Sequence, residues 1–137
     1  MKFEYSPVFG LKDSKEKLVK RPVLILELLS KDGSVLEVPA VVDSGADTTV
    51  VNIEYAKALG ITLGGEQPIL GIGKGKVSSR PGRLPFKIKN TNFMLDVPAW
   101  YVDSENVGIL LGQEMFFETF MIKFEKKQDT FEIVKAK

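Results

Sequence analysis

Short runs of β-branched and aromatic residues follow one another along most of this chain, with turn residues between them at close spacing. Strands are predicted at residues 23–29, 35–42, 68–72, 76–79, 84–88, 93–97, 100–102, 121–124 and 131–134. Turns are predicted at residues 31–34, 73–75, 81–82, 90–92, 103–106 and 125–130. Many short strands with few helices are typical of a small β-barrel, so the pattern predicts an all-β domain.

Only two segments favour a helix. Asn52 is a suitable N-cap for a helix over residues 53–59, and Gly60 is placed to end it. Residues 113–120 do not alternate as a strand would, and they predict a second short helix. The expected fold class is therefore all-β with one or two short helices.

Length and charge limit the organisation and the partners of the chain. A length of 137 residues fits a single domain, in which residues 1–20 are expected to form an N-terminal strand and a charged loop. Nineteen basic and eighteen acidic residues give a net charge of +1, which does not favour nucleic acid as a partner. Neither a membrane span nor a signal peptide is indicated, so no membrane partner and a cytoplasmic location are expected.

Histidine and cysteine are both absent from the sequence. Their absence excludes a Ser-His-Asp triad, an imidazole general base and a thiol nucleophile, and it removes the usual protein ligands of a zinc hydrolase. Any catalysis must therefore use carboxylates, lysines, tyrosines or a bound cofactor.

The segment from Val41 to Val51 places an acidic turn, Asp43-Ser44-Gly45-Ala46-Asp47, between two β-branched runs. A carboxylate at the end of a buried strand is costly unless it is hydrogen-bonded, paired or protonated, so Asp43 is a candidate functional residue. Asp-Ser-Gly is also common turn chemistry, and the tripeptide alone leaves a purely structural role open.

The wider pattern resembles the retropepsin family of aspartic proteases. Residues 41–50, Val-Val-Asp-Ser-Gly-Ala-Asp-Thr-Thr-Val, resemble its active-site motif. Leu70-Gly71-Ile72-Gly73 resembles its glycine-rich flap, and Ile109-Leu110-Leu111-Gly112 resembles the element that packs behind the catalytic loop. The resemblance covers residues 23–134 and implies a closed small β-barrel of the retropepsin-like acid protease type, with neither a cofactor nor a metal.

The resemblance implies roles for two groups of residues. The catalytic group is Asp43, Ser44 and Gly45, and the substrate-binding group is Ala46, Asp47, Gly71, Ile72 and Gly73. Gln113 departs from the family pattern, because many members have an arginine there that can pair with the second acid. The resemblance leaves the network around Asp47 open.

Aspartic proteolysis needs two carboxylates that share a proton, and the chain has one such motif, since Asp103-Ser104 and Asp13-Ser14 lack the following glycine. We therefore expect a homodimer that pairs Asp43 with Asp43 of a second copy and cleaves peptide or protein substrates. The resemblance implies a dimer interface built from terminal strands, either residues 3–9 or residues 131–134.

Two alternatives belong to other functional classes. A non-catalytic retropepsin-like module for dimerisation or protein binding would keep the fold without the activity. A nucleotide-binding fragment would explain Asp-Ser-Gly-Ala-Asp-Thr-Thr, but that fold needs two large domains, and residues 71–76 lack the first glycine of a phosphate loop. The sequence therefore favours an aspartic endopeptidase over both.

Overall fold

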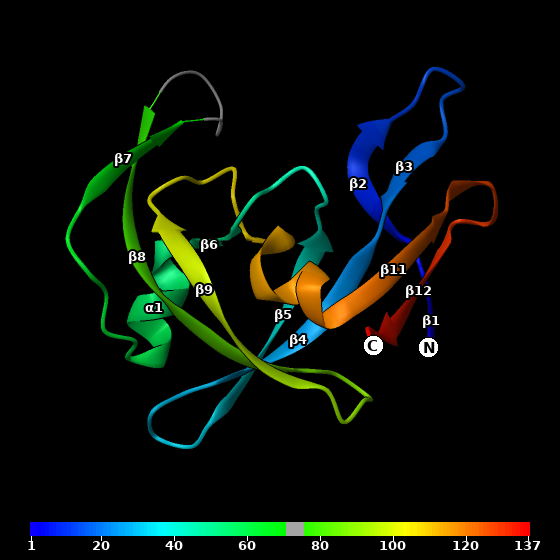
Figure 1. Ribbon diagram of the computed structural model, residues 1–137. Coiled ribbons are helices and arrows are strands. Elements are labelled where there is room, and N and C mark those ends of the chain that lie inside the picture. The colour runs from blue at the N-terminus through cyan, green and yellow to red at the C-terminus, as the bar shows by residue number, and fades with distance from the viewer. Residues whose placement is uncertain (71–75) are drawn as a thin grey trace.

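The computed structural model describes the backbone of residues 1–70 and 76–137 (Figure 1). Its main sheet consists of β4 (Val23–Leu29), β5 (Val35–Val42), β6 (Thr49–Asn52), β7 (Gln67–Leu70), β8 (Lys76–Ile88), β9 (Met94–Val102) and β10 (Ile109–Leu111). The remaining strands are β1 (Lys2–Glu4), β2 (Ser6–Lys12), β3 (Leu18–Arg21), β11 (Phe120–Glu125) and β12 (Thr130–Lys135). The only α-helix among the described residues, α1 (Ile53–Leu59), follows β6 directly.

The main sheet closes on itself. Its order is β4-β5-β10-β6-β9-β8-β7, and an additional pairing of β4 with β8 joins the first strand to the sixth, so that β7 lies outside the ring. Most pairs are antiparallel, but β10 runs parallel to β5, and β6 runs parallel to β9. The predicted all-β class and the closed small barrel are confirmed.

Alternation along β4 shows why the barrel forms. Leu24, Leu26 and Leu28 are buried, whereas Ile25 and Glu27 between them are more exposed, so one face of the strand lines the core. The full register with β5 confirms the hairpin predicted from the turn at residues 31–34. The barrel is filled by this leucine face together with the large side chains of β8 and β9.

The turn predicted at residues 81–82 is wrong, because β8 continues through Pro81 and Gly82 as one strand. The glycine is needed here for close packing, since a Cβ at Gly82 would lie 2.7 Å from the side chain of Leu63. Pro81 keeps its place because its carbonyl accepts a hydrogen bond from the backbone N–H of Gly64 at 2.7 Å. The segments predicted at 93–97 and 100–102 likewise form one strand, β9.

Helix α1 agrees with the prediction, whereas the second predicted helix does not. Asn52 caps α1 by accepting a hydrogen bond from the backbone N–H of Glu54 at 2.9 Å, and Gly60 ends it with φ of 71°. Residues 113–120 are not one helix, because Met115 takes a left-handed φ of 67° within the short turn η1 (Gln113–Phe117). Residue 120 already belongs to β11.

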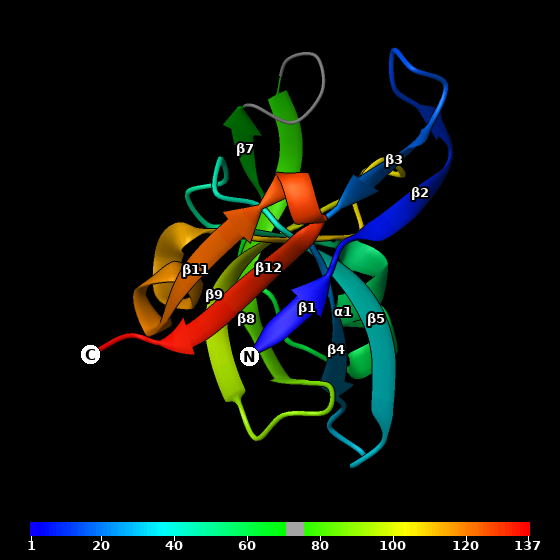
Figure 2. The same cartoon turned by 90° about the vertical axis from the view of Figure 1, so that its right-hand side faces the viewer.

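The chain termini build a separate three-stranded sheet beside the barrel (Figure 2). β11 and β12 form the predicted terminal hairpin around the short 3₁₀ turn η2 (Lys126–Gln128), and β1 pairs with β12 so that Phe3 lies opposite Phe131. The rings of Phe3 and Phe131 stack with centroids 5.4 Å apart. β12 is therefore the central strand of this sheet, and β1 and β11 are its edges.

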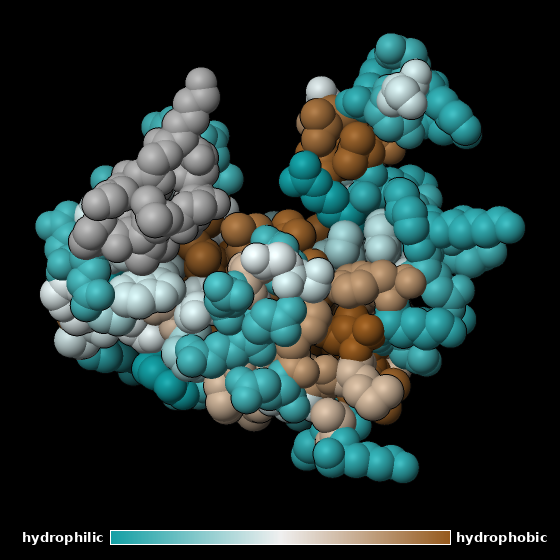
Figure 3. All heavy atoms as spheres, turned by 45° about the horizontal axis from the view of Figure 1, so that its top comes forward, coloured by the Kyte–Doolittle hydropathy of each residue, from teal (hydrophilic) through white to brown (hydrophobic). Residues whose placement is uncertain are grey.

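β2 and β3 form a two-stranded hairpin over most of the segment expected as a charged loop. Figure 3 shows this hairpin standing clear of the rest of the surface. Both ribbon views place it at the end of the barrel that carries the loop between β5 and β6 (Figures 1 and 2). Within the described part of the chain, no helix combines the length and the apolar character that crossing a membrane requires.

Candidate active site

The loop of residues 43–48, called here the β5–β6 loop, carries the predicted catalytic residues. It joins two strands that are not neighbours, because β10 lies between them and pairs with both. The loop must therefore cross over the end of β10. This arrangement brings residues 43–48 against residues 111–114, which lie more than sixty positions later in the sequence.

Backbone hydrogen bonds hold the loop against the segment that follows β10. The N–H of Asp43 donates to the carbonyl of Leu111 at 2.9 Å, the first of three such contacts. The N–H of Gln113 donates to the carbonyl of Ala46 at 2.8 Å, and the N–H of Glu114 donates to that of Asp47 at 2.9 Å. Since these bonds fix both ends of the loop, its conformation depends on the position of the later segment.

Gly112 lies at the closest approach between the two segments. A Cβ at this position would lie 2.6 Å from the carbonyl carbon and oxygen of Thr48 and 2.7 Å from the carbonyl oxygen of Ala46. The backbone N–H of Gly112 donates to the hydroxyl of the fully buried Thr49 at 3.1 Å. Glycine is required here for lack of space, because the loop backbone occupies the volume of a side chain.

The Asp43 carboxylate is only partly exposed and is held by its own loop. Its Oδ1 accepts a hydrogen bond from the backbone N–H of Gly45 at 2.9 Å. Ser44 and Gly45 are exposed beside it, and the described residues contain no ion pair to Asp43. The carboxylate is thus oriented by the backbone and placed where a substrate, a water molecule or a second protein chain can reach it.

Gln113 stabilises the loop, although its position is one where retropepsins often have arginine. Its side-chain amide Nε2 donates to the carbonyl of Ser44 at 2.7 Å. Asp47 is exposed, and its contact with this segment is made through its backbone carbonyl. The Gln113 side chain therefore supports the backbone next to Asp43 and does not bond to the Asp47 carboxylate.

The structure brings five of the predicted site residues together in one loop, namely Asp43, Ser44, Gly45, Ala46 and Asp47. The predicted flap residues Gly71, Ile72 and Gly73 lie outside the described residues. Sequence reasoning did not identify Thr49 and Gln113 as residues that support the loop. The position of Thr49 inside a β-branched run was the available signal for the first, and the departure of Gln113 from the family pattern was the available signal for the second.

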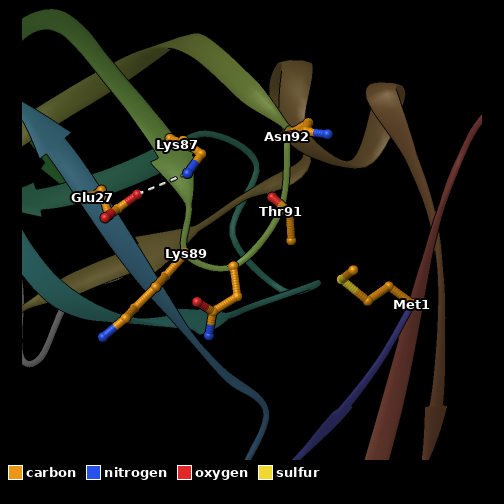
Figure 4. A pocket seen from close by; sticks show the side chains of 7 residues that line it. Met1, Glu27, Lys87, Lys89, Thr91 and Asn92 are labelled. Carbon is orange, nitrogen blue, oxygen red and sulfur yellow. Dashed lines mark hydrogen bonds and ion pairs between the residues drawn. The ribbon is translucent and has the colours of Figure 1, made fainter.

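A polar pocket of about 420 Å³ lies at the opposite end of the barrel, between Met1 and the turn that joins β8 to β9 (Figures 1 and 4). Its lysines are already paired: Lys87 with Glu27 at 3.2 Å and Lys89 with Glu37 at 2.9 Å. The described residues contain no cluster of acidic side chains that could hold a metal ion. The β5–β6 loop is therefore the better candidate site.

Comparison with known proteins identifies the family. A family model described as aspartyl protease matches residues 30–115. The chain belongs to the aspartyl protease family. The matched residues include the β5–β6 loop, Gly112 and Gln113. No curated protein matches the chain in sequence.

Solved structures show that this chain has a retropepsin-like fold. A retropepsin-like aspartic protease from Rickettsia conorii matches with a TM-score of 0.56 and 18% identity, over 80% of this chain and 97% of that one. The retroviral protease-like domain of Ddi1 from Leishmania major matches with a TM-score of 0.52 and 15% identity, over 84% and 89% of the two chains. EIAV protease in complex with the inhibitor HBY-793 has a TM-score of 0.47 and 23% identity, over 75% and 88%.

Proposed function

We propose that this chain is an aspartic endopeptidase that acts as a homodimer, with Asp43 from each of two copies forming the catalytic pair. The observation that carries the proposal is the position of Asp43 in the family-matched region, on an exposed loop whose backbone is fixed by Leu111 and Gln113. A carboxylate held in this way has a defined direction, as a general acid or base requires.

The proposed reaction uses the two carboxylates in different protonation states. Two like charges at hydrogen-bonding distance do not both ionise readily, so the pair shares one proton. The ionised carboxylate removes a proton from a water molecule, which attacks the scissile carbonyl carbon of the peptide. The protonated carboxylate donates its proton to the carbonyl oxygen as the tetrahedral intermediate forms.

The other residues of the loop have supporting roles in this proposal. Gly45 orients Asp43 through its backbone N–H and, having no side chain, leaves room for substrate. Ser44 is exposed next to it, where its hydroxyl can bond across the pair to the loop of the second copy. Ala46 and Asp47 follow as contacts for the substrate main chain. Gly71, Ile72 and Gly73 are proposed to cover the substrate on the basis of the sequence pattern.

The homodimer is part of the proposal, because one chain supplies one catalytic motif. Of the two terminal segments considered for the interface, residues 131–134 belong to β12, which already has a strand on each side. A strand from a second copy can therefore be added to the terminal sheet at the edge formed by β1 or at the edge formed by β11. A single domain over residues 1–137 also remains a proposal.

The test compares wild-type protein with Asp43→Asn on a diverse peptide mixture from acidic to neutral pH, with new termini read by mass spectrometry. Asparagine keeps an acceptor for the N–H of Gly45, so the loop should fold unchanged while the general acid and base is lost. Asp96→Asn, at an exposed aspartate of β9, is the matched control. Cleavage by wild type and Asp96→Asn but not by Asp43→Asn is the expected result.

Three other results would contradict the proposal. Cleavage by Asp43→Asn would mean that another residue carries the reaction. Absence of cleavage by a wild-type protein that sediments as a dimer would favour the non-catalytic binding module. Full peptidase activity at concentrations where only monomer sediments would exclude the shared catalytic pair.

A further inference from the structure

Among the described residues, the β2–β3 hairpin has no structural partner that accounts for its apolar side chains. It forms a two-stranded sheet of its own, and no third strand of the described chain pairs with it. Phe9 is 84% exposed, and Leu11 and Leu18 are 41% and 40% exposed. Figure 3 shows apolar side chains gathered on one side of the hairpin, turned towards the middle of the molecule. An isolated hairpin of this kind is at best marginally stable in water.

The hairpin is nevertheless well ordered at both of its ends. At its tip, Oδ1 of Asp13 accepts hydrogen bonds from the backbone N–H groups of Lys15 and Lys17 at 2.8 and 3.1 Å. At its base, the N–H of Tyr5 donates to the carbonyl of Asp129 at 2.7 Å, and Lys20 pairs with the Asp129 carboxylate at 3.8 Å. The hairpin is therefore built as a defined projection from the terminal sheet.

We propose that the β2–β3 hairpin is an arm that packs against a second copy of this chain, on the face that carries the β5–β6 loop. This inference rests on the proposed homodimer and names the surface that assembles it. The arm projects at the same end of the barrel as the β5–β6 loop, which carries Asp43 (Figures 1 and 2). A second copy that presents its own Asp43 to this one must approach that end, and it thereby meets the arm.

Charge supports a second copy as the occupant. The arm, residues 6–21, has five basic residues and two acidic ones, which gives a net charge of +3: Lys12, Lys15, Lys17, Lys20 and Arg21 against Asp13 and Glu16. Four acids are exposed in the β5–β6 loop, in the loop between β9 and β10, and in η1: Asp47, Asp103, Glu105 and Glu114. None of these four forms an ion pair with another described residue. The basic arm of one copy thus complements these four acids of the other.

The contact repeats in a dimer with two-fold symmetry, because each arm reaches across to the other copy. Burying Phe9 in this way removes its ring from water, and large aromatic side chains at the centre of an interface are the usual sites of strong binding. The attraction between the arm and the four acids is screened by salt, so the dimer should also weaken as ionic strength rises.

The first test measures the dimer dissociation constant of the full chain by sedimentation equilibrium. The double variant Phe9→Ser/Leu11→Ser should raise it about a hundredfold, at about tenfold per arm. Because both side chains are exposed in a single chain, the variant should unfold at the same urea concentration as wild type when both are diluted until only monomer sediments. Val35→Ser is the matched control, since Val35 is 54% exposed and begins β5, at the end of that strand away from the β5–β6 loop. It should leave the dissociation constant unchanged.

The second test identifies what the arm touches. Because the chain has no cysteine, Phe9→Cys gives a single thiol for a photoreactive maleimide label. Protein that carries the maleimide label and has natural isotope content is mixed with ¹⁵N-enriched protein that carries no maleimide label, and the mixture is cross-linked. Mass spectrometry then distinguishes links between chains from links within one chain. Links to ¹⁵N peptides that contain Asp47, Asp103 or Glu114 are expected, whereas the same label at Val35→Cys should give none.

The outcomes separate this inference from the proposed function. The inference about the arm would be wrong if Phe9→Ser/Leu11→Ser left the dissociation constant of the dimer unchanged. It would also be wrong if the arm cross-linked only within its own chain. Neither result would contradict the proposed aspartic endopeptidase. If the dimer depends on the arm but no cleavage depends on Asp43, the inference about the arm is upheld and the proposed endopeptidase activity is refuted. A wild-type chain that stays monomeric would overturn both.

Discussion

Replacing Gly112 by alanine tests the close approach on which the candidate site depends. The added Cβ would lie 2.6 Å from the carbonyl carbon and oxygen of Thr48, whereas ordinary contact begins at 3.4 Å. The loop backbone must therefore move by about 0.8 Å, the difference between these two distances. Rotation of a side chain cannot relieve this clash, because the atoms that the added Cβ would contact belong to the main chain.

The magnitude follows from two contributions. Overpacking at a site without free space costs about 1–3 kcal/mol. The same movement stretches the hydrogen bonds from Gln113 to Ala46 and from Gly112 to Thr49, each worth about 1 kcal/mol. The free energy of unfolding should fall by about 3–5 kcal/mol in Gly112→Ala, a large part of the about 5–15 kcal/mol that stabilises a typical domain.

The assay is urea unfolding of wild type, Gly112→Ala and Gly108→Ala. Gly108 is the matched control, because nothing lies within 4 Å of a Cβ at that position. We expect the midpoint for Gly112→Ala to fall by about 2 M urea, at a slope of about 2 kcal/mol per molar. Gly108→Ala should stay within about 1 kcal/mol of wild type. Equal midpoints for the two variants would refute the reasoning, because the loop would then have space that the structure does not show.

Two further substitutions test single contacts elsewhere in the fold. Asn52→Asp keeps an N-cap acceptor but removes the side-chain N–H bonds to the carbonyls of Ser104 and Val107, at 3.0 and 2.9 Å, so urea unfolding should show a loss of about 2–3 kcal/mol. Asp32→Asn tests a pH dependence, because bonds from the Ser34 hydroxyl and backbone N–H hold the pKa of Asp32 below its usual value of 3.8. Because its pKa is lowered in the folded state, the ionised Asp32 carboxylate stabilises the fold above pH 3.8, and this stabilisation is lost as pH falls further. Asp32→Asn should therefore be less stable than wild type at pH 7 and similar to it near pH 2.

Each of these predictions has its own control. Asn92→Asp makes the same chemical change at an exposed turn residue, and an equal loss of stability there would mean that the two carbonyl contacts of Asn52 contribute nothing. For Asp32, thermal unfolding of both proteins from pH 2 to pH 7 gives the comparison. A stability difference that stays constant over that range would show that the charge of the carboxylate is not involved.

Local patterns in the sequence were sufficient to predict much of the fold and the position of the candidate site. The β4–β5 hairpin, helix α1 and the β11–β12 hairpin depend on alternation, a capping residue and turn residues within a few positions of one another. The acidic turn at Asp43 was visible for the same reason, since it interrupts two runs of β-branched residues. These features are decided by neighbours in the chain.

Errors arose where distant residues decide the local conformation. Pro81 and Gly82 were expected in a turn, but they remain in a strand because Leu63 and Gly64 pack and bond against them. Residues 113–120 were expected to form a helix, but their first residues bond to the β5–β6 loop and leave the helical path at Met115. Propensity gives way here to contacts that it does not describe.

The sequence by itself determined that the chain is rich in short strands, that its chemistry must do without histidine and cysteine, and that Asp43 stands where a buried strand ends. Only the tertiary structure decided that β10 lies between β5 and β6, that Gln113 supports the carbonyl of Ser44, and that β12 is enclosed by two other strands. The physical reason is that strand pairing joins residues far apart in the chain, and neither partner alone carries a signal for the other.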